Sequence, residues 1–212
     1  MTTGSGHFFM LRWHCMTPKT FIFTGRSGCG KGTQLKLLKD YFEKNNPESP
    51  SFLSVTGDMF RSFFETNTQT SMFAKELTNK GELQPLFLTI WLWAKSFVEN
   101  YKPESNVYID GYPRRLEEAV AVDSMLMFYK RVDVTVLNFV VSRETSKARM
   151  FARGRSDDTP DNAETRLNWY DKDVTPAIDF FRNKPGYIFL DIDGEQPIEK
   201  IHQDIINKLN LK

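Results

Sequence analysis

The chain has 212 residues, of which 40% are hydrophobic and 26% charged, with a formal net charge of +1 and an isoelectric point of about 7.7. This length allows one well-buried core and is short for two ordinary domains, so we expect a single domain. The balanced charge excludes a global basic field that could hold a nucleic acid backbone, and any anion site must therefore be local. We expect no nucleic acid among its partners.

Residues 1–15 differ from the rest of the sequence. They hold a short apolar patch between His7 and Trp13, without the long hydrophobic segment of a signal peptide, and a strand pattern begins soon after them. We interpret residues 1–15 as an upstream extension or a cloning remnant and residues 16–212 as the single domain.

Cysteine usage and hydropathy indicate the compartment. The only cysteines are Cys15 and Cys29, and the second lies in a glycine-rich turn where a disulfide would obstruct a ligand. No segment reaches the roughly 18 uninterrupted apolar residues of a transmembrane helix. We therefore expect a cytoplasmic protein without a membrane partner.

Short apolar runs alternate with longer helical patterns, which is typical of a parallel sheet wrapped by helices. The runs that predict strands are 20–24, 51–55, 106–110, 134–141 and 187–192. The patterns that predict helices are 31–44, two short helices between 58 and 80, 83–101, 116–129, a helix capped by Ser142 and ending near Arg153, 163–182 and 198–211. We expect the helix over 83–101 to be buried, because apolar residues cover most of its circumference.

A glycine-rich turn, GRSGCGKGTQ from Gly25 to Gln34, follows the first predicted strand directly and opens a helix. Its backbone N–H groups can converge at the helix N-terminus, an arrangement that suits a polyphosphate. Lys31 would reach the outer phosphates, and the hydroxyl of Thr33 would hold magnesium, although Gly32 separates these two residues where the strict motif has no intervening residue. We interpret Cys29 as an inert residue at a position of the turn that requires only a small side chain; a redox role is the alternative.

Two further motifs can bind an acceptor. In TGDMFR, Thr56 and Arg61 lie at a strand-to-helix junction, where a hydroxyl and a guanidinium can bind a base and a phosphate; a helix cap and a solvated arginine are the alternative. In DGYPRR, Asp110 ends a strand and can orient magnesium through its water shell, while Arg114 can grip a phosphate. We interpret Arg115 as a surface charge.

A cluster of arginines lies in and on both sides of RGRSDD, at positions 153–158. Phosphoryl transfer is accelerated mainly by positioning and by cations that meet charge on the transferred group. The cluster supplies such cations beside Asp157 and Asp158, although a helix paired with its own acids would look similar, above all at Arg149. Its members are Arg149, Arg153, Arg155 and Arg166.

In this order, the four motifs resemble the adenylate kinase family of nucleoside monophosphate kinases, from about residue 20 to the C-terminus. The resemblance implies an α/β fold with a P-loop NTPase-type parallel sheet flanked by helices, an insertion at about 55–84 that binds the monophosphate, and a lid at about 152–160. It also implies a monomeric phosphotransferase that uses Mg²⁺ and moves the terminal phosphoryl group of ATP to AMP, giving two ADP.

The resemblance assigns roles residue by residue. It implies catalytic roles for Lys31, Arg114, Arg153, Arg155 and Arg166. It implies contacts to the triphosphate from Gly28, Cys29, Gly30, Lys31, Gly32, Thr33, Arg153 and Gln196. It implies contacts to the monophosphate from Thr56, Arg61, Glu82, Leu83, Gln84, Gly111, Arg114, Glu118, Arg155 and Arg166, and magnesium contacts through water from Thr33 and Asp110.

The predicted lid is short, because only Gly154 separates Arg153 from Arg155. The long-lid form of the family often holds zinc with cysteines, and this lid has none, so we expect no structural zinc.

Glu118 departs from the family, which usually has at this position a glutamine whose amide both donates to and accepts from adenine. An ionised carboxylate can only accept, so it suits the N6 amino group and offers nothing to N1. Glu118 is protonated or displaced, or neighbouring Glu117 matters, or the acceptor preference is altered. We expect AMP as acceptor; the alternatives are GMP, UMP or CMP, a broader range, or a catalytically silent nucleotide-binding module.

Overall fold

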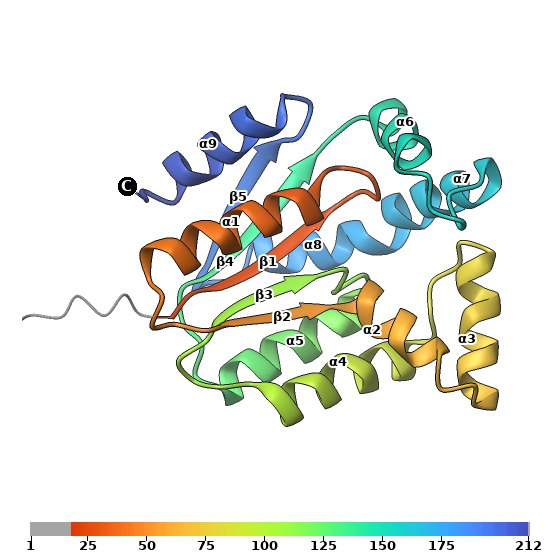
Figure 1. Ribbon diagram of the computed structural model, residues 1–212, viewed down its shortest axis with the longest axis horizontal. Coiled ribbons are helices and arrows are strands. Elements are labelled where there is room, and N and C mark those ends of the chain that lie inside the picture. The colour runs from red at the N-terminus through yellow and green to blue at the C-terminus, as the bar shows by residue number, and fades with distance from the viewer. Residues whose placement is uncertain (1–17, 212) are drawn as a thin grey trace, which may run out of the picture.

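The computed structural model describes residues 18–211, so the interpretation of residues 1–15 falls outside the described residues. The strands are β1 (Thr20–Gly25), β2 (Ser51–Val55), β3 (Asn106–Asp110), β4 (Val134–Val140) and β5 (Tyr187–Asp193). The helices are α1 (Lys31–Asn45), α2 (Thr56–Phe64), α3 (Gln69–Asn79), α4 (Leu86–Asn100), α5 (Leu116–Phe128), α6 (Arg143–Arg153), α7 (Pro160–Trp169), α8 (Thr175–Arg182) and α9 (Ile198–Lys208), with a π-helical turn η1 (Tyr170–Val174) between α7 and α8 (Figure 1). The predicted strands are confirmed.

The strands form one parallel sheet in the order β2-β3-β1-β4-β5. Central β1 pairs with β3 on one side and β4 on the other, with Phe23 opposite both Asp110 and Leu137. The carboxyl ends of β1 and β3 therefore meet at the point where the strand order reverses, which is where ligands bind in open α/β sheets. The predicted P-loop α/β fold is confirmed.

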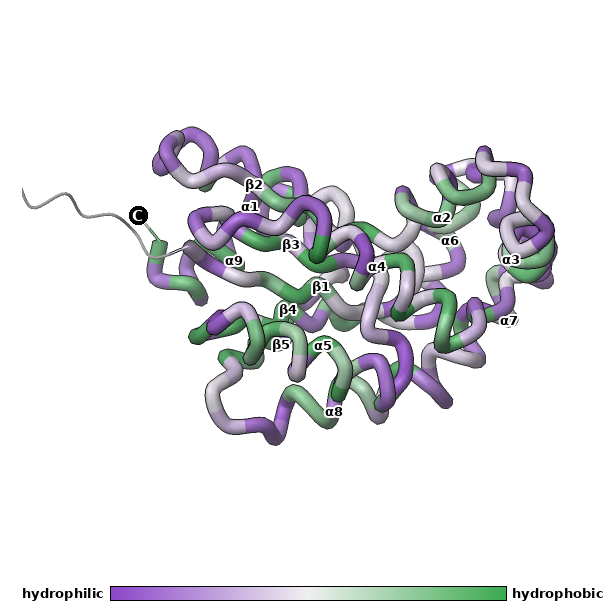
Figure 2. Tube along the Cα trace, turned by 90° about the horizontal axis from the view of Figure 1, so that it is seen from below, coloured by the Kyte–Doolittle hydropathy of each residue, from purple (hydrophilic) through white to green (hydrophobic). Residues whose placement is uncertain are grey.

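Two apolar layers cover the faces of the sheet. Alternate residues of β1 point to opposite faces, so Phe21 and Phe23 pack under α1 and α9, whereas Ile22 packs against α4, α5 and α8. The strands at the centre of Figure 2 are largely hydrophobic, as expected for a sheet buried on both faces. This core holds the carboxyl edge of the sheet in place.

The site elements extend beyond this edge. Helices α2 and α3 confirm the two predicted short helices, and they pack on α4 through a separate cluster that contains Phe60, Ala74 and Leu92. Helices α6 and α7 pack on each other through Met150 and Leu167. In Figure 1, α3 and α7 lie at the same end of the molecule, away from the sheet.

Helix α4 corrects the expectation of a helix buried on all sides. It begins at Leu86, after Pro85, and its inner face buries Leu92 and Trp93. Its outer face leaves Phe87 and Val98 68% and 78% exposed. A helix that covers one face of a sheet buries only one apolar stripe. Apolar residues on its other side can remain exposed to solvent, so their presence does not show that another element covers that side.

The segment predicted as helical over 163–182, apart from Pro176, is present as α7, η1 and α8; it begins earlier, at Pro160, and Pro176 lies in the first turn of α8. The hydroxyl of Thr159 caps α7 by accepting a hydrogen bond from Asn162 N at 3.3 Å. Proline at the first helical position costs no hydrogen bond, since that N–H has no intrahelical acceptor. Within residues 18–211, no helix has the length and apolar character needed to cross a membrane.

Arg131 joins the amino ends of the central strands, a role that the sequence did not reveal. Its Nε donates to Thr20 Oγ1 at 2.7 Å, its Nη2 donates to Lys19 O at 2.8 Å and Ser105 O at 3.1 Å, and its Nη1 donates to Pro103 O at 3.1 Å. One guanidinium thus satisfies three carbonyl groups at the start of β1 and β3.

We expect Arg131→Ala to lower the free energy of unfolding by about 3 kcal/mol, because several charge-assisted hydrogen bonds are lost and their acceptors lie partly buried. Urea denaturation measures this as a lower midpoint at unchanged m-value. The control is Arg182→Ala, which removes an exposed pair with Asp191 and should cost much less. Equal losses in the two variants would contradict the anchoring role.

Candidate active site

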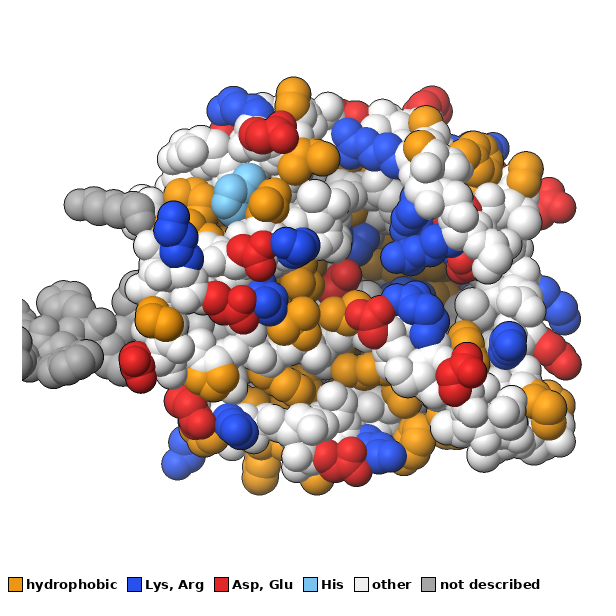
Figure 3. Space-filling model, viewed as in Figure 1, with side chains coloured by type: hydrophobic (Ala, Val, Ile, Leu, Met, Phe, Trp, Pro, Cys, Tyr) orange, Lys and Arg blue, Asp and Glu red, His pale blue; other side chains and the backbone are white. Residues whose placement is uncertain are grey.

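A cavity of about 600 Å³ opens at the carboxyl edge of the sheet. It lies between the glycine-rich loop, α2, α3 and the loop from α6 to α7, and Figure 3 shows Lys and Arg side chains around the hollow on this face. Its lining brings together residues that lie far apart in the sequence. The predicted site residues that line it are Thr56, Arg61, Glu82, Gln84, Arg114, Arg153, Arg155 and Arg166.

The glycine-rich loop joins β1 to α1 and borders the cavity through Ser27. Gly28 has φ +82°, and a Cβ there would come within 2.5 Å of Ser146 O, so only glycine lets the loop pack on α6. The Lys31 amine donates to Gly25 O at 2.7 Å and to Arg26 O at 2.9 Å, across the loop. Cys29 is buried beneath the glycine-rich loop, in agreement with a packing role.

Thr56 and Gly111 bring α2 against the end of β3. Thr56 begins α2, is buried, and its hydroxyl lies 3.5 Å from Asp110 O. Gly111 has φ +86°, and a Cβ there would collide with the Thr56 hydroxyl. Glycine at 111 is therefore what allows the threonine to approach the strand end. Arg61, one turn further along α2, lines the cavity and pairs with Asp58.

Asp110 and Arg114 form the inner, charged wall of the site. Burial raises the pKa of Asp110, against the opposing effect of the charges of Lys31 and Arg114. Burial lowers the pKa of Arg114, against the charges of Glu118 and Asp110. The Arg114 guanidinium lies over the Trp169 ring, 5.2 Å from its centre. The two groups thus stabilise each other's charged forms where water is scarce.

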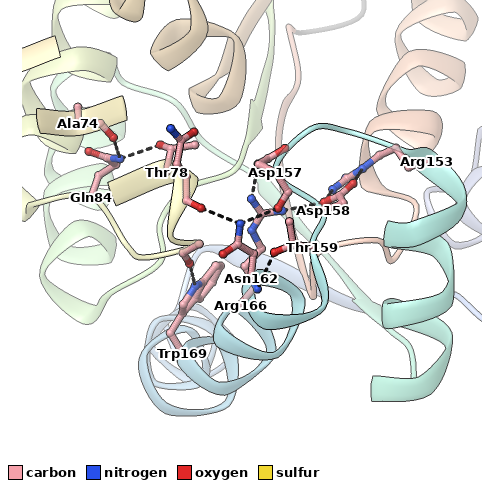
Figure 4. Close-up of polar contacts among 12 residues, drawn as sticks. Ala74, Thr78, Gln84, Arg153, Asp157, Asp158, Thr159, Asn162, Arg166 and Trp169 are labelled. Carbon is pink, nitrogen blue, oxygen red and sulfur yellow. Dashed lines mark hydrogen bonds and ion pairs between the residues drawn. The ribbon is translucent and has the colours of Figure 1, made fainter. Parts of the chain in front are cut away.

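At the loop between α6 and α7, two arginines pair with two aspartates (Figure 4). Arg153 makes a bidentate contact with Asp158, at 2.9 and 2.8 Å, and Arg166 donates to the same carboxylate at 2.9 Å and also pairs with Asp157. Burial disfavours the charge of Asp158, but the hydrogen bonds and charges of Arg153 and Arg166 outweigh it and hold its pKa below the usual value. These contacts fix Arg153 and Arg166.

Arg155 is different, because within residues 18–211 its side chain has no hydrogen bond or ion pair. Burial lowers its pKa, and the positive charges of Arg153 and Arg61 lower it further. Like charges converge here on one cavity, and a multivalent anion is the partner that would relieve their repulsion.

Comparison of the chain with models of protein families identifies its family. The model of the adenylate kinase family matches residues 23–185, which include the glycine-rich loop, α2 and the arginine loop. The chain belongs to the adenylate kinase family. It is accordingly an enzyme, a nucleotide-binding phosphotransferase with nucleoside monophosphate kinase function.

Curated relatives support this assignment over most of the chain. An adenylate kinase of Corynebacterium urealyticum is 32% identical over 185 residues, covering 86% of this chain and 94% of the relative. An adenylate kinase of Rhodococcus erythropolis is 33% identical and covers 82% of this chain and 91% of the relative. An adenylate kinase of Prochlorococcus marinus is 30% identical and covers 90% and 98%.

Of the predicted site residues, Asp110 and the loop residues from Gly28 to Thr33 lie beside the cavity without lining it, and four others also do not line it. Leu83 borders a neighbouring groove, and Gln196 donates to Asp204 at 3.0 Å on α9. Glu118 is 1% exposed and bonds to the Arg114 backbone. Gly111 acts through its contact with Thr56. Arg149, whose role was left open, donates to Gly194 O at 2.8 Å.

Arg115, interpreted from the sequence as a surface charge, is only partly exposed and contacts two other residues. Its Nη1 donates to Gln84 O at 2.9 Å and lies 3.5 Å from the Glu118 carboxylate. Sequence spacing could have suggested the ionic contact, because positions 115 and 118 share one face of a helix. The contact to Gln84 joins segments 31 residues apart and had no local signal.

The arginine loop also touches the acceptor insertion directly, which the sequence did not reveal. Asn162 Nδ2 donates to Asn79 O at 2.9 Å and to Asp157 O at 3.0 Å, and Trp169 Nε1 donates to Gly81 O at 3.0 Å. These bonds join α7 to the end of α3 across the mouth of the cavity (Figure 4).

Arg26, in the glycine-rich loop, is a second residue that the sequence analysis missed. Its Nη1 donates to Val141 O at 2.9 Å, its Nη2 donates to Asp171 at 2.7 Å, and its guanidinium lies 4.9 Å from the centre of the Tyr170 ring. Asp171 also accepts from Arg143. The loop that holds the lysine is thereby linked to the π-helical turn after α7.

We expect Asp158→Asn to lower the free energy of unfolding by about 2 kcal/mol at neutral pH, because two arginines lose their shared anion. The folded pKa of Asp158 is depressed, so this stability is complete above the unfolded pKa of about 4 and is lost as pH falls through the lower folded pKa. Urea unfolding of both proteins from neutral to acidic pH should show the difference shrinking below about pH 4. A difference that stays constant would contradict the assignment.

Asp40→Asn is the matched control for this experiment. Asp40 pairs with Lys36 at 2.7 Å on the exposed face of α1, and such pairs contribute little because water screens them. Its effect should be small throughout the pH range.

Proposed function

We propose that this adenylate kinase family member transfers the terminal phosphoryl group of ATP reversibly to AMP, giving two ADP. The observation that carries the proposal is the convergence of Arg61, Arg114, Arg155 and Arg166 on one cavity beside the glycine-rich loop. These cations come from α2, the end of β3 and both sides of the arginine loop. They suit two polyphosphate chains that meet end to end.

The donor triphosphate binds the loop from Gly28 to Thr33, where backbone N–H groups at the start of α1 point outward. Lys31 has a flexible stem, so its amine can move from the carbonyls of Gly25 and Arg26 to the transferred phosphate. Arg153 and Gln196 complete the donor contacts in this proposal.

The acceptor monophosphate binds on the opposite side of the cavity. Arg61 and Arg114 grip its phosphate, and Thr56 with the backbone of residues 82–84 contacts the base. The bonds from Asn162 and Trp169 to Asn79 and Gly81 hold this wall against α7. In this proposal, the insertion at about 55–84 and the lid at about 152–160 are the segments that move when the cavity opens and closes.

Mg²⁺ fits the residues at the centre of the site. Asp110 Oδ1 is shielded from solvent and has no hydrogen-bond partner within residues 18–211, and Thr33 presents its hydroxyl at the start of α1. Magnesium in such sites is held by one or two side chains, water and the substrate phosphates, so a larger cluster of acids is not required. When bound, it neutralises charge on the phosphates; Asp110 and Thr33 orient it through water.

The protein needs no strong base, because the acceptor phosphate is already a nucleophile at neutral pH. Arg155 and Arg166 meet the charge that spreads over the equatorial oxygens during transfer, while Lys31 and Arg114 keep the two chains in line. Closure of the short lid excludes water, which would otherwise accept the phosphoryl group. We further propose a cytoplasmic monomer that binds no nucleic acid and uses no structural zinc.

A coupled assay with Mg-ATP against AMP, GMP, CMP, UMP and dTMP tests the proposed acceptor. We expect AMP to give the highest kcat/KM, because Thr56 and the backbone of residues 82–84 form the base wall. Lys31→Ala should abolish this turnover. A clear preference for a pyrimidine monophosphate would contradict AMP, and absence of turnover with every acceptor would favour a catalytically silent module.

Arg155→Ala tests the transfer role directly. Because this arginine has no protein partner in the described chain, its removal leaves no carboxylate unpaired and should hardly change the midpoint of unfolding. We expect kcat to fall about 10³-fold, the range seen when a single transition-state arginine is lost. Arg182→Ala, far from the cavity, should leave kcat unchanged. A fall of less than about tenfold in Arg155→Ala would rule out that role.

A further inference from the structure

Glu118 occupies the position at which the family resemblance implies a base-reading amide, but its carboxylate is committed elsewhere. It lies in the first turn of α5, 1% exposed, and does not line the cavity. One oxygen, Oε2, accepts a hydrogen bond from Arg114 N at 2.8 Å, and the other, Oε1, lies 3.5 Å from Arg115 Nη1. Both oxygens thus contact neighbouring residues of the protein, and the side chain is not exposed to the cavity.

Arg115 continues this connection to the wall of the cavity. Its Nη1 donates to Gln84 O at 2.9 Å. The Gln84 side chain in turn donates through Nε2 to Ala74 O at 2.7 Å and to Thr78 Oγ1 at 2.9 Å. Gln84 and Thr78 both line the cavity. A continuous path of polar contacts thus runs from α5 through Gln84 to α3.

The same carboxylate acts on the phosphate side. Arg114 lines the cavity, and its backbone N–H is one of the free donors that precede α5. An acidic side chain in the first turn can satisfy such a donor and fix the angle at which the chain enters the helix. Glu118 therefore fixes the backbone from which the Arg114 side chain reaches the cavity.

We propose that Glu118 and Arg115 form a positioning pair for the acceptor site, holding Arg114 on the phosphate side and Gln84 on the base side, and that residue 118 does not read the base. The inference rests on the proposed monophosphate kinase function and deepens it. Base discrimination then depends on Thr56 and the backbone of residues 82–84.

Burial and charge support this assignment. A buried carboxylate is costly unless its oxygens are bonded, and Glu118 has a backbone donor on one oxygen and a guanidinium on the other. Burial raises the pKa of Glu118, whereas the Arg114 amide and the charges of Arg114 and Arg115 act against that shift. Removal of either member would leave the other buried and poorly paired, so the two residues should act as a unit.

The pair predicts a distinctive pattern of kinetic constants. Loss of Arg115 releases Gln84 and loosens the wall for every acceptor, whatever its base. The glycine-rich loop lies on the other side of the cavity, so the KM for ATP should change little. Glu118→Gln keeps an acceptor for the Arg114 amide but loses the charge that holds Arg115.

The experiment measures KM and kcat for ATP and for AMP, GMP, CMP and UMP in Arg115→Gln, Glu118→Gln and the double variant. We expect Arg115→Gln to raise the KM of each accepted monophosphate about tenfold, the effect of one charge-assisted hydrogen bond, with the KM for ATP within about twofold. The ratio of kcat/KM between AMP and GMP should stay within about threefold in a further variant, Glu118→Ala, which removes the carboxylate without supplying an amide that could read the base. The double variant should resemble Arg115→Gln, because coupled residues are not additive.

Two further variants complete the design. Arg115→Lys keeps a cation and the long stem, so it should recover part of the acceptor KM and provides the measurement if Arg115→Gln folds poorly. Arg182→Gln is the matched control, since it breaks an exposed arginine–aspartate pair on β5, 2.6 Å long, far from the cavity. Its KM values should equal those of the wild type.

A shift of tenfold or more in the AMP to GMP ratio of Glu118→Ala would identify Glu118 as a base reader and overturn the inference. Equal rises in the KM for ATP and for the acceptors would show that the pair only stabilises the fold, and this result would also overturn the inference. A wild-type protein that turns over no monophosphate would overturn the proposed function and this inference together, which distinguishes that failure from the first two.

Discussion

The pairing of β1 with both β3 and β4 is the constraint on which the site depends. Because the strands are parallel, their carboxyl ends meet at one edge, and the chain must leave β1 and β3 there through Gly25 and Gly111. The glycine-rich loop, Asp110 and Thr56 are therefore neighbours before any ligand binds. Arg131 joins the amino ends of the same strands. The carboxyl edge therefore belongs to a sheet that is held at its other end as well.

Charge balance is the second constraint, because arginines that converge on a cavity repel one another. Asp157 and Asp158 offset this repulsion for Arg153 and Arg166 and leave Arg155 unpaired. The loop between α6 and α7 therefore holds two arginines paired with protein carboxylates and one that is unpaired. In the proposed function, the paired arginines stabilise the loop, and Arg155 remains available to bind the transferred phosphoryl group.

The sequence predicted the fold well where local chemistry and tertiary structure agree. The five strands, the glycine-rich turn and the Ser142 cap are local patterns, and each is present in the structure. It failed where the outcome depends on a partner distant in sequence. The exposed side of α4 at Phe87, the link from Arg26 to Asp171 and the bond from Trp169 to Gly81 all depend on how separate segments pack, which no window of sequence contains.

Glu118 occupies a position that the family uses to read the base, but its contacts favour a different role. The position lies four residues after Arg114, and a glutamine there could turn its amide toward a base. Arg115 changes the local field, because a guanidinium three positions away on the same helical turn attracts a carboxylate strongly and an amide weakly. Once the carboxylate turns toward the Arg114 amide and Arg115, the guanidinium is oriented to reach Gln84. In the proposed positioning pair, the departure at 118 and the arginine at 115 are therefore one structural feature, and the role of each residue depends on the other.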